Sequence, residues 1–416
     1  MIMTIVFFFF YIFAFPINNI PIIDSSWIAF SMLLVFFIIN NDYRDTVLRL
    51  ICNKQIYKIC GIIAIISLYG AINTSLSNRY DFQFIVTLIH QIISLLFGVF
   101  VVSYAIYKKN NIIETIIYSF FIQSIIQMTS MISPQFRDAT NILRPESAII
   151  RGQWTYTGIR GLGISGSAFF GLAISYGLLF VLWALNRKEV LKNVPLALKM
   201  LILGFIIVGG VSAGRTSLFG LIFALFIIIY SSNVSDVINK EINGGSLIAS
   251  IACFALLVPF IIYANTKGMF DLKVFDYFSN YATEFIRTGH TTSGASLRHM
   301  YFNIDLYTFV FGDGAYGSNL HYYMSTDAGY MRVILYMGFP GIILLCWLQI
   351  QYLVKHNRWI IMAFLLVMQI KGEVIGFSII IESMLLLYYF YQVEPMGNMN
   401  NMKDIVYSSC LAQNNQ

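Results

Sequence analysis

Long apolar runs, separated by shorter polar segments, recur along the whole chain. A helix of about 20 apolar residues is long enough to cross a lipid bilayer. By this measure the chain has about twelve transmembrane helices, of which the first, second and eleventh are short or weak, at 2–16, 26–40, 59–76, 84–107, 112–132, 161–185, 196–213, 216–231, 247–265, 327–354, 359–370 and 374–392. The pattern therefore predicts an all-α, polytopic protein in which residues 1–416 form a single integral membrane domain.

The composition supports this interpretation. Of the 416 residues, 58% are hydrophobic and 11% are charged, whereas a soluble domain carries about 25% charged residues. So few polar side chains cannot cover a water-facing surface of this size, and the remaining surface must face lipid. The first run has no basic segment before it and no small-residue cleavage site after it, so we expect a transmembrane helix there and not a removable signal.

The basic residues predict the orientation of the chain. With the N-terminus in the cytoplasm, ten of the 13 lysines fall in cytoplasmic segments, whereas nine of the 13 arginines fall on the outer side. The guanidinium group grips phosphate or carboxylate with two parallel hydrogen bonds. The outer arginines are therefore candidates for binding an anionic substrate, with ordinary solubilising loop residues as the alternative.

Two outer segments, 133–160 and 265–326, are longer than connecting turns. Loops of this length are usually functional or disordered, and the second is too rich in aromatic residues to be disordered. We expect it to pack on the membrane surface as short helices and a glycine-rich turn. The polar segment 393–416 is expected to be a loose cytoplasmic tail.

Arginines mark two candidate anion sites near predicted helix ends. Arg215 stands in a turn so short that its side chain must lie at the membrane boundary, where a cation is costly unless it faces a cavity or an anion. Snorkelling towards water is the alternative. Arg151 and Arg160 precede the glycine-rich start of the sixth run, where exposed helical N–H groups favour an anion.

The large outer loop carries two further motifs. Arg298 and His299 precede Gly312-Asp-Gly314, a glycine spacing that favours a tight turn. Asp327 stands where the next helix is expected to begin. It either caps that helix or orients or deprotonates a hydroxyl group just outside the membrane.

Several classes of function lack support. The chain has no zinc-protease, nucleophile-elbow or nucleotide-loop motif, and its five cysteines are scattered, as apolar fillers are. His290, His299 and His321 lack a regular ligand spacing, so we expect no metal site and no cofactor. No basic face favours nucleic acid.

Taken in order, these motifs resemble the O-antigen polymerase and O-antigen ligase superfamily. Arg215 is similar to the family's arginine between two adjacent helices, and Arg298 to the arginine that precedes the Gly-x-Gly turn. Gly338 and Gly341 follow Asp327 by eleven and fourteen positions, as two glycines follow the histidine that begins the same helix in the ligases. A polar residue other than histidine at that position resembles the polymerases.

The resemblance covers about residues 130–345 and implies a function. Family members act on glycans linked to undecaprenyl pyrophosphate at the periplasmic face of the bacterial inner membrane. The resemblance thus implies a metal-independent glycosyltransferase with a membrane-embedded fold of the GT-C type, which transfers the growing chain to the non-reducing end of a new repeat unit. The partners it implies are the lipid-linked oligosaccharide, membrane lipid, a flippase and a chain-length regulator.

The resemblance also implies residue roles. The pyrophosphate is expected to be bound, and its developing charge stabilised, by Arg151, Arg160, Arg215 and Arg298. Asp327 is the candidate for orienting the attacking hydroxyl group or accepting its proton, with Glu284, His299 and His321 as the alternatives. Asp327, Arg215 and Arg298 thus form the expected catalytic set. The candidates for contact with the glycan are Glu284, His299, Tyr316 and His321, with anchoring at the interface as the alternative for the tyrosine.

Two other functions stay open. A ligase would transfer the glycan to the lipid A core, and a transporter or flippase would form no new bond. Transporters usually show inverted repeats and charges near the bilayer midplane. The sequence has no clear repeat, and the ionisable residues well inside its predicted runs are His90, Glu114 and Glu382.

Overall fold

Helices make up about three quarters of the chain that the computed structural model describes, namely residues 1–17, 23–144, 163–167, 169–231, 297–317, 322–353, 358–376 and 378–393. They are α1 (Ile2–Phe13), α2 (Ser25–Ile39), α3 (Asn41–Ile51), α4 (Lys54–Leu76), α5 (Gln83–Tyr107), α6 (Ile112–Ile132), α7 (Pro134–Asn141), α9 (Phe170–Leu185), α10 (Leu196–Ala213), α11 (Ser217–Ser231), α16 (Leu306–Phe311), the 3₁₀ turn η1 (Tyr323–Ser325), α17 (Gly329–Gln351), α18 (Arg358–Gln369) and α19 (Ile379–Val393). Within these ranges, β-type backbone pairing is limited to two isolated β-bridges. The predicted all-α class is confirmed.

Five of the described helices, α4, α5, α6, α10 and α17, are long and apolar enough to cross a membrane. The pair α2 and α3 passes the same test jointly but bends by 117° between the two helices, which gives up to six spans. Shorter apolar helices are α1, α9, α11, α18 and α19. This composition suits a polytopic membrane protein. The expected number of twelve spans stays a prediction, and the run at 247–265 lies outside the described residues.

The structure adds two helices that the hydrophobic pattern did not predict, α7 in the segment 133–160 and α3. The segment 41–58 was expected to be a cytoplasmic connection, but α3 occupies most of it. The helix begins where the Asn40 side chain accepts a hydrogen bond from the backbone N–H of Tyr43, at 2.8 Å. It buries Tyr43 and Leu50 and packs on α5, while its charged residues stay partly or fully exposed. This division of faces is typical of a helix that lies in the membrane–water interface.

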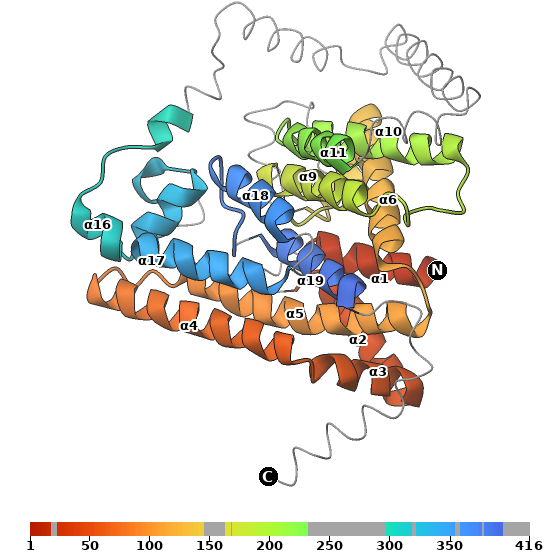
Figure 1. Cartoon of the computed structure of the whole chain (residues 1–416), viewed down its shortest axis with the longest axis horizontal. Coiled ribbons are helices and arrows are strands. Elements are labelled where there is room, and N and C mark those ends of the chain that lie inside the picture. The colour runs from red at the N-terminus through yellow and green to blue at the C-terminus, as the bar shows by residue number, and fades with distance from the viewer. Residues whose placement is uncertain are drawn as a thin grey trace, which may run out of the picture.

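The packing places helices from distant parts of the sequence side by side. Figure 1 shows α4, α5 and α17 lying nearly parallel, and contacts join α4 to both of the others. The closest pairing is that of α9 with α11, because a Cβ atom added at Gly220 would lie 2.1 Å from the Cα atom of Gly177. Small residues of this kind let two membrane helices approach each other closely.

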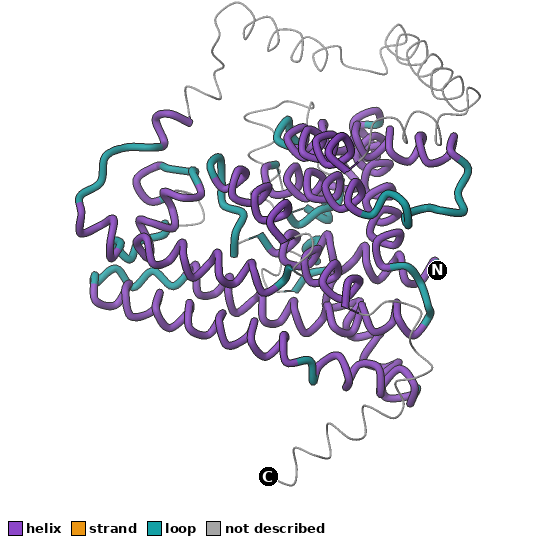
Figure 2. Tube along the Cα trace, in the orientation of Figure 1, coloured by secondary structure: helices purple, strands orange, loops and turns teal. Residues whose placement is uncertain are grey.

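One end of the bundle, the junction end, gathers four connections: 77–82, 214–216, 312–317 and 370–376. The backbone N–H of Tyr316 donates to Asp81 at 2.8 Å, and Lys371 donates to Thr216 at 3.0 Å. Figure 2 shows the turn after α4 beside the segment that leads into α17. In the orientation predicted from the lysines, the junction end faces outwards.

The opposite end of the bundle is tied together in the same way. Gln55, at the start of α4, donates to the backbone oxygen of Gln351, at the end of α17, at 2.7 Å. Asn110, after α5, donates to Thr4 of α1 at 2.6 Å. These contacts join the start of α4 to the end of α17, and the segment after α5 to the start of α1.

Candidate functional site

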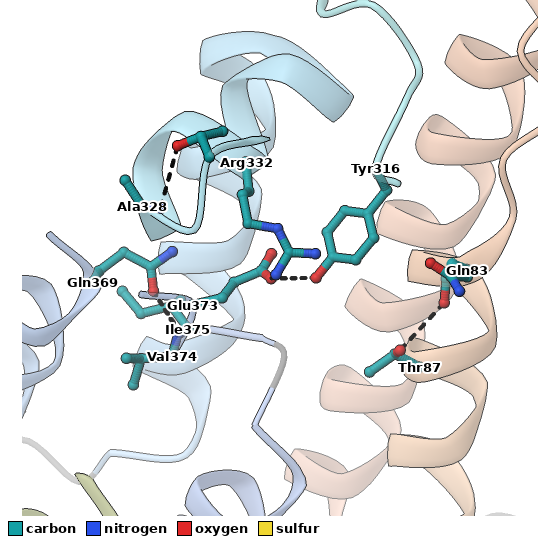
Figure 3. Close-up of polar contacts among 10 residues, drawn as sticks. Gln83, Thr87, Tyr316, Ala328, Arg332, Gln369, Glu373, Val374 and Ile375 are labelled. Atoms are coloured by element: carbon teal, nitrogen blue, oxygen red, sulfur yellow. Dashed lines mark hydrogen bonds and ion pairs between the residues drawn. The ribbon is translucent and has the colours of Figure 1, made fainter. Parts of the chain in front are cut away.

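A buried ion pair lies at the centre of the junction end. Arg332 Nη1 is 2.9 Å from Glu373 Oε2, and the two side chains are 7% and 3% exposed. Arg332 belongs to the first turn of α17, whereas Glu373 belongs to the connection between α18 and α19 (Figure 3). Because removing one partner of such a pair leaves an uncompensated buried charge, the pair links these two elements tightly.

Two tyrosines surround the arginine of this pair. The guanidinium carbon of Arg332 lies 4.0 Å from the centre of the Tyr316 ring and 4.2 Å from that of the Tyr322 ring. The Tyr316 hydroxyl group donates to the same Glu373 oxygen that the arginine contacts (Figure 3). Cation–π attraction and this hydrogen bond together hold the end of the large loop against α17.

The burial of this cluster changes how its acidic groups titrate. Burial raises the pKa of Glu373 from 4.5 to about 7, while Arg332 and the Tyr316 hydroxyl group act in the opposite direction. The charge of Asp327 raises the same pKa further, which places Asp327 within electrostatic reach of the pair. Burial also raises the pKa of Tyr316, and the Glu373 charge acts in the same direction. At neutral pH, Tyr316 is therefore a hydrogen-bond donor.

The turn that carries Tyr316 depends on glycine and on one acidic side chain. Gly312 and Gly314 adopt φ angles of 78° and 66°, which residues with a side chain rarely adopt. The Asp81 carboxylate accepts hydrogen bonds from the backbone N–H groups of Tyr316 and Gly317, both at 2.8 Å. The predicted tight turn is confirmed, and Asp81 fixes it to the end of α4.

The connection that carries Glu373 is buried although it is not helical. Residues 372–376 are all buried. The backbone N–H groups of Val374 and Ile375 both donate to the Gln369 side-chain oxygen, at 2.7 and 2.9 Å (Figure 3). Non-helical backbone at membrane depth is tolerated where protein groups satisfy it, and Gln369 satisfies two of these donors.

Asp327 lies directly before α17 and is half-buried. The helix begins at Gly329 with Ala328 as its N-cap residue, and no side chain caps it. The prediction that Asp327 caps this helix is therefore wrong. The other expectation, that the carboxylate meets a substrate hydroxyl group, stays a prediction.

Two cations lie together where α10 meets α11. Arg215 is half-buried in the turn between these helices. The neighbouring residue, Thr216, accepts a hydrogen bond from the exposed Lys371 at 3.0 Å. The turn that holds Arg215 therefore contacts the same connection that holds Glu373.

Arg298 and His299 are both exposed. Tyr301, two residues after the histidine, donates its hydroxyl hydrogen to the backbone oxygen of Ile370 at 2.6 Å. This contact holds the Arg298 segment beside the connection 370–376. Three predicted site segments, those of Arg215, Arg298 and Asp327, thus lie against one connection.

Three comparisons with known proteins bear on this site. No family model matches the chain, and no curated protein or solved structure matches it. The resemblance to the O-antigen polymerases and ligases therefore rests on the motifs alone and stays a prediction.

The remaining predicted residues divide into two groups. Those that lie outside the described residues are Arg151, Arg160, Glu284 and His321. Tyr316 is described, but it is 4% exposed, and its ring contacts Arg332, Phe84 and Tyr336. In this arrangement the Tyr316 ring supports the site from within and has no face open to a sugar ring.

Glu373 was not predicted from the sequence, and Arg332 and Lys371 were not distinguished there from the other outer basic residues. The available signal was local: Lys371-Gly-Glu373 interrupts two apolar runs at 359–370 and 374–392. A charged pair between two apolar runs is an ordinary loop pattern, so only the contacts identify it as part of a site.

Proposed function

We propose that the protein is a surface-polysaccharide polymerase that joins lipid-pyrophosphate-linked oligosaccharide repeat units at the outer face of a membrane. One observation carries the proposal: the segments of Arg215, Arg298 and Asp327 lie against a single connection, 370–376, at one end of a helical bundle. These are the residues on which the resemblance to the polymerases rests.

The charges at this end suit a lipid pyrophosphate. Arg215 and Lys371 lie on neighbouring segments, and Lys371 and Arg298 are exposed. An arginine fork binds a phosphate group with two parallel hydrogen bonds. A lipid-linked donor reaches such a site with its pyrophosphate at the membrane boundary and its tail in the bilayer.

The proposed reaction needs one group for each charge that develops. A hydroxyl oxygen of the new repeat unit attacks the anomeric carbon of the growing chain, and the bond from that carbon to the pyrophosphate breaks. Asp327 accepts the hydroxyl proton, and Arg215 and Arg298 stabilise the charge on the leaving pyrophosphate. Arg332, Glu373 and Tyr316 position these segments and contact no substrate.

The test removes each proposed cation in turn. Arg215→Ala and Arg298→Ala are each expected to lower polymer formation at least about 100-fold, as the loss of one transition-state donor does. Cells that lack the wild-type protein and express either variant should then display single repeat units without a ladder of longer polymer. Arg358→Ala is the matched control, because Arg358 lies at the opposite end of the bundle and contacts the Leu353 backbone oxygen.

Ladders of normal length from both variants, with normal membrane insertion, would refute the proposal. Single repeats that still reach the lipid A core while polymer is lost favour a polymerase over a ligase.

A second candidate, a transporter with no chemistry, is favoured by a separate observation. Glu382 is 5% exposed inside the bundle, close to the non-helical connection 370–376. Buried ionisable residues and interrupted helices are typical of transport sites. Purified protein mixed with a lipid-linked repeat unit in detergent distinguishes the two, because a polymerase makes a longer glycan there and a transporter does not.

A further inference from the structure

A second polar cluster lies inside the bundle, on three helices that are distant in sequence. Gln91 of α5, Gln349 of α17 and Glu382 of α19 are 2%, 0% and 5% exposed. Gln349 donates to Glu382 Oε1, which also accepts the backbone N–H of Gly376 at 3.2 Å. Gln91 donates to the backbone oxygen of Gly376 at 2.6 Å. These hydrogen bonds connect the three side chains through one residue.

Several oxygen atoms of this cluster lack a hydrogen-bond donor among the described residues. Across the described ranges, Gln91 Oε1, Gln349 Oε1 and Glu382 Oε2 are buried and have no hydrogen-bond partner. The hydroxyl oxygen of Ser378, two residues after Gly376, is in the same situation. Each buried acceptor that lacks a partner costs about 1–3 kcal/mol. The buried Tyr352 hydroxyl group forms one hydrogen bond with Glu382. The four remaining atoms in one cluster indicate that a further electropositive group belongs there.

The charge of the cluster indicates what that group is. Glu382 forms no ion pair with any residue in the described part of the chain. Carboxylate, amide and hydroxyl oxygens are the ligands that hard cations prefer. A single carboxylate balances one positive charge, whereas a divalent ion would leave an excess charge in a region of low dielectric constant. The ligand set therefore suits a monovalent ion.

The backbone at this place has the shape that such a site needs. The chain turns at Gly376, where φ is 73° and where an added Cβ atom would lie 2.3 Å from the Leu345 side chain. α19 begins three residues later. Non-helical backbone of this kind supplies backbone oxygens to the cation sites of membrane proteins.

A small hollow near the cluster is lined by Tyr11, Asp24, His90 and Ser94, among others. Ser94 contacts Ser383 at 3.3 Å, and Ser383 is the neighbour of Glu382. Asp24 caps the start of α2, so an acidic side chain lies in the wall of this hollow.

We propose that Gln91, Gln349 and Glu382 bind a monovalent hard cation of the Na⁺ class inside the bundle. The ion satisfies the oxygens that the protein leaves without donors and neutralises Glu382. The proposal does not depend on the polymerase activity, because its ligands include none of Arg215, Arg298 and Asp327.

The experiment measures thermal unfolding of the full chain in detergent as NaCl replaces choline chloride at constant ionic strength. The unfolding temperature of the wild-type protein is expected to rise with the Na⁺ concentration, because an ion that binds only the folded state stabilises it. Glu382→Gln should abolish the rise. Glu114→Gln is the matched control and should keep it, since Glu114 accepts a hydrogen bond from Leu191 N at 2.7 Å at the other end of the bundle.

A second variant covers the case in which Glu382→Gln does not fold. Gln91→Met removes one ligand at similar volume and should raise the Na⁺ concentration of half-maximal effect by about tenfold. Equal unfolding temperatures of the wild-type protein in Na⁺ and choline would overturn the proposal. So would a rise that persists in Glu382→Gln, or stabilisation by low pH with no effect of Na⁺, which would assign a proton to Glu382.

Discussion

Arginines that look equivalent along the sequence differ in their surroundings. Arg332 is enclosed by Glu373, Tyr316 and Tyr322, whereas Arg298 is exposed. The outer position of both follows from the hydrophobic pattern, and so does the expectation that some of them bind an anion. Their division into structural and substrate-facing groups does not follow, because the partners of Arg332 lie up to 41 positions away in the sequence.

The first prediction concerns the pH dependence of stability. The folded-state pKa of Glu373, about 7, exceeds its ordinary value of 4.5. Its contribution to stability is therefore fully present below about pH 4.5 and is lost as the pH rises through about 7. As the pH rises from about 4.5 to about 7, the unfolding free energy of the wild-type protein should decrease relative to that of Glu373→Gln. Thermal unfolding at a series of pH values measures this difference. Glu189→Gln, a change at an exposed carboxylate, should show no such trend.

The opposite trend would contradict this prediction. If the wild-type protein gained stability over Glu373→Gln as the pH rose, the attraction of Arg332 would outweigh the burial of the carboxyl group.

At the scale of the element, α17 contains a break that hydropathy does not reveal. Gly338 has a φ angle of 65° inside this helix, and Pro340 follows, which lacks a backbone N–H. The run 327–354 was predicted as one uninterrupted span. The glycine and proline at 338–341 were visible in the sequence, but the reason for the break is the short helix α16 that packs there.

The second prediction tests this break. A Cβ atom at Gly338 would lie 2.2 Å from the Val310 backbone oxygen, and the positive φ angle would be strained as well. Gly338→Ala should therefore lower the free energy of unfolding by more than about 1 kcal/mol, measured by denaturation in detergent. Gly204→Ala is the control, because an added Cβ atom there meets nothing within 4 Å. An equal effect of both changes would contradict the role of the close approach.

The third prediction concerns the buried connection between α18 and α19. Gln369→Ala leaves the backbone N–H groups of Val374 and Ile375 without their acceptor, at a cost of about 1–3 kcal/mol for each unsatisfied group. The unfolding temperature should fall clearly below that of Gln135→Ala, which alters an exposed glutamine on α7. A Gln369→Ala protein as stable as this control would show that water satisfies the connection.

At the scale of the whole molecule, a bundle of apolar helices was predictable, because lipid-facing surface and the short polar segments between apolar runs are properties of the sequence itself. The meeting of 77–82, 214–216, 312–317 and 370–376 was not predictable. It depends on side-chain contacts between segments separated by as many as 236 positions.

The fourth prediction assigns the two ends to the two sides of the membrane. The test uses two variants, each with a single cysteine and with the other native cysteines replaced by serine. One keeps Cys52, which is exposed beyond α3, and the other carries Asn78→Cys in the turn after α4. A membrane-impermeant maleimide should label Asn78→Cys in intact cells and Cys52 only after permeabilisation. The reverse pattern would invert the orientation predicted from the lysines.

The short helices α18 and α19 and the connection between them have a consequence for the synthesis of the protein. At 12 and 15 residues, these helices are about 18 and 22 Å long, and the hydrocarbon core of a bilayer is about 30 Å thick. Neither helix spans the bilayer alone, and the connection between them carries Lys371 and Glu373. Its buried partners, such as Arg332 and Tyr316, come earlier in the chain. The ribosome therefore has to deliver those earlier helices first, and the last pair to be synthesised completes the site.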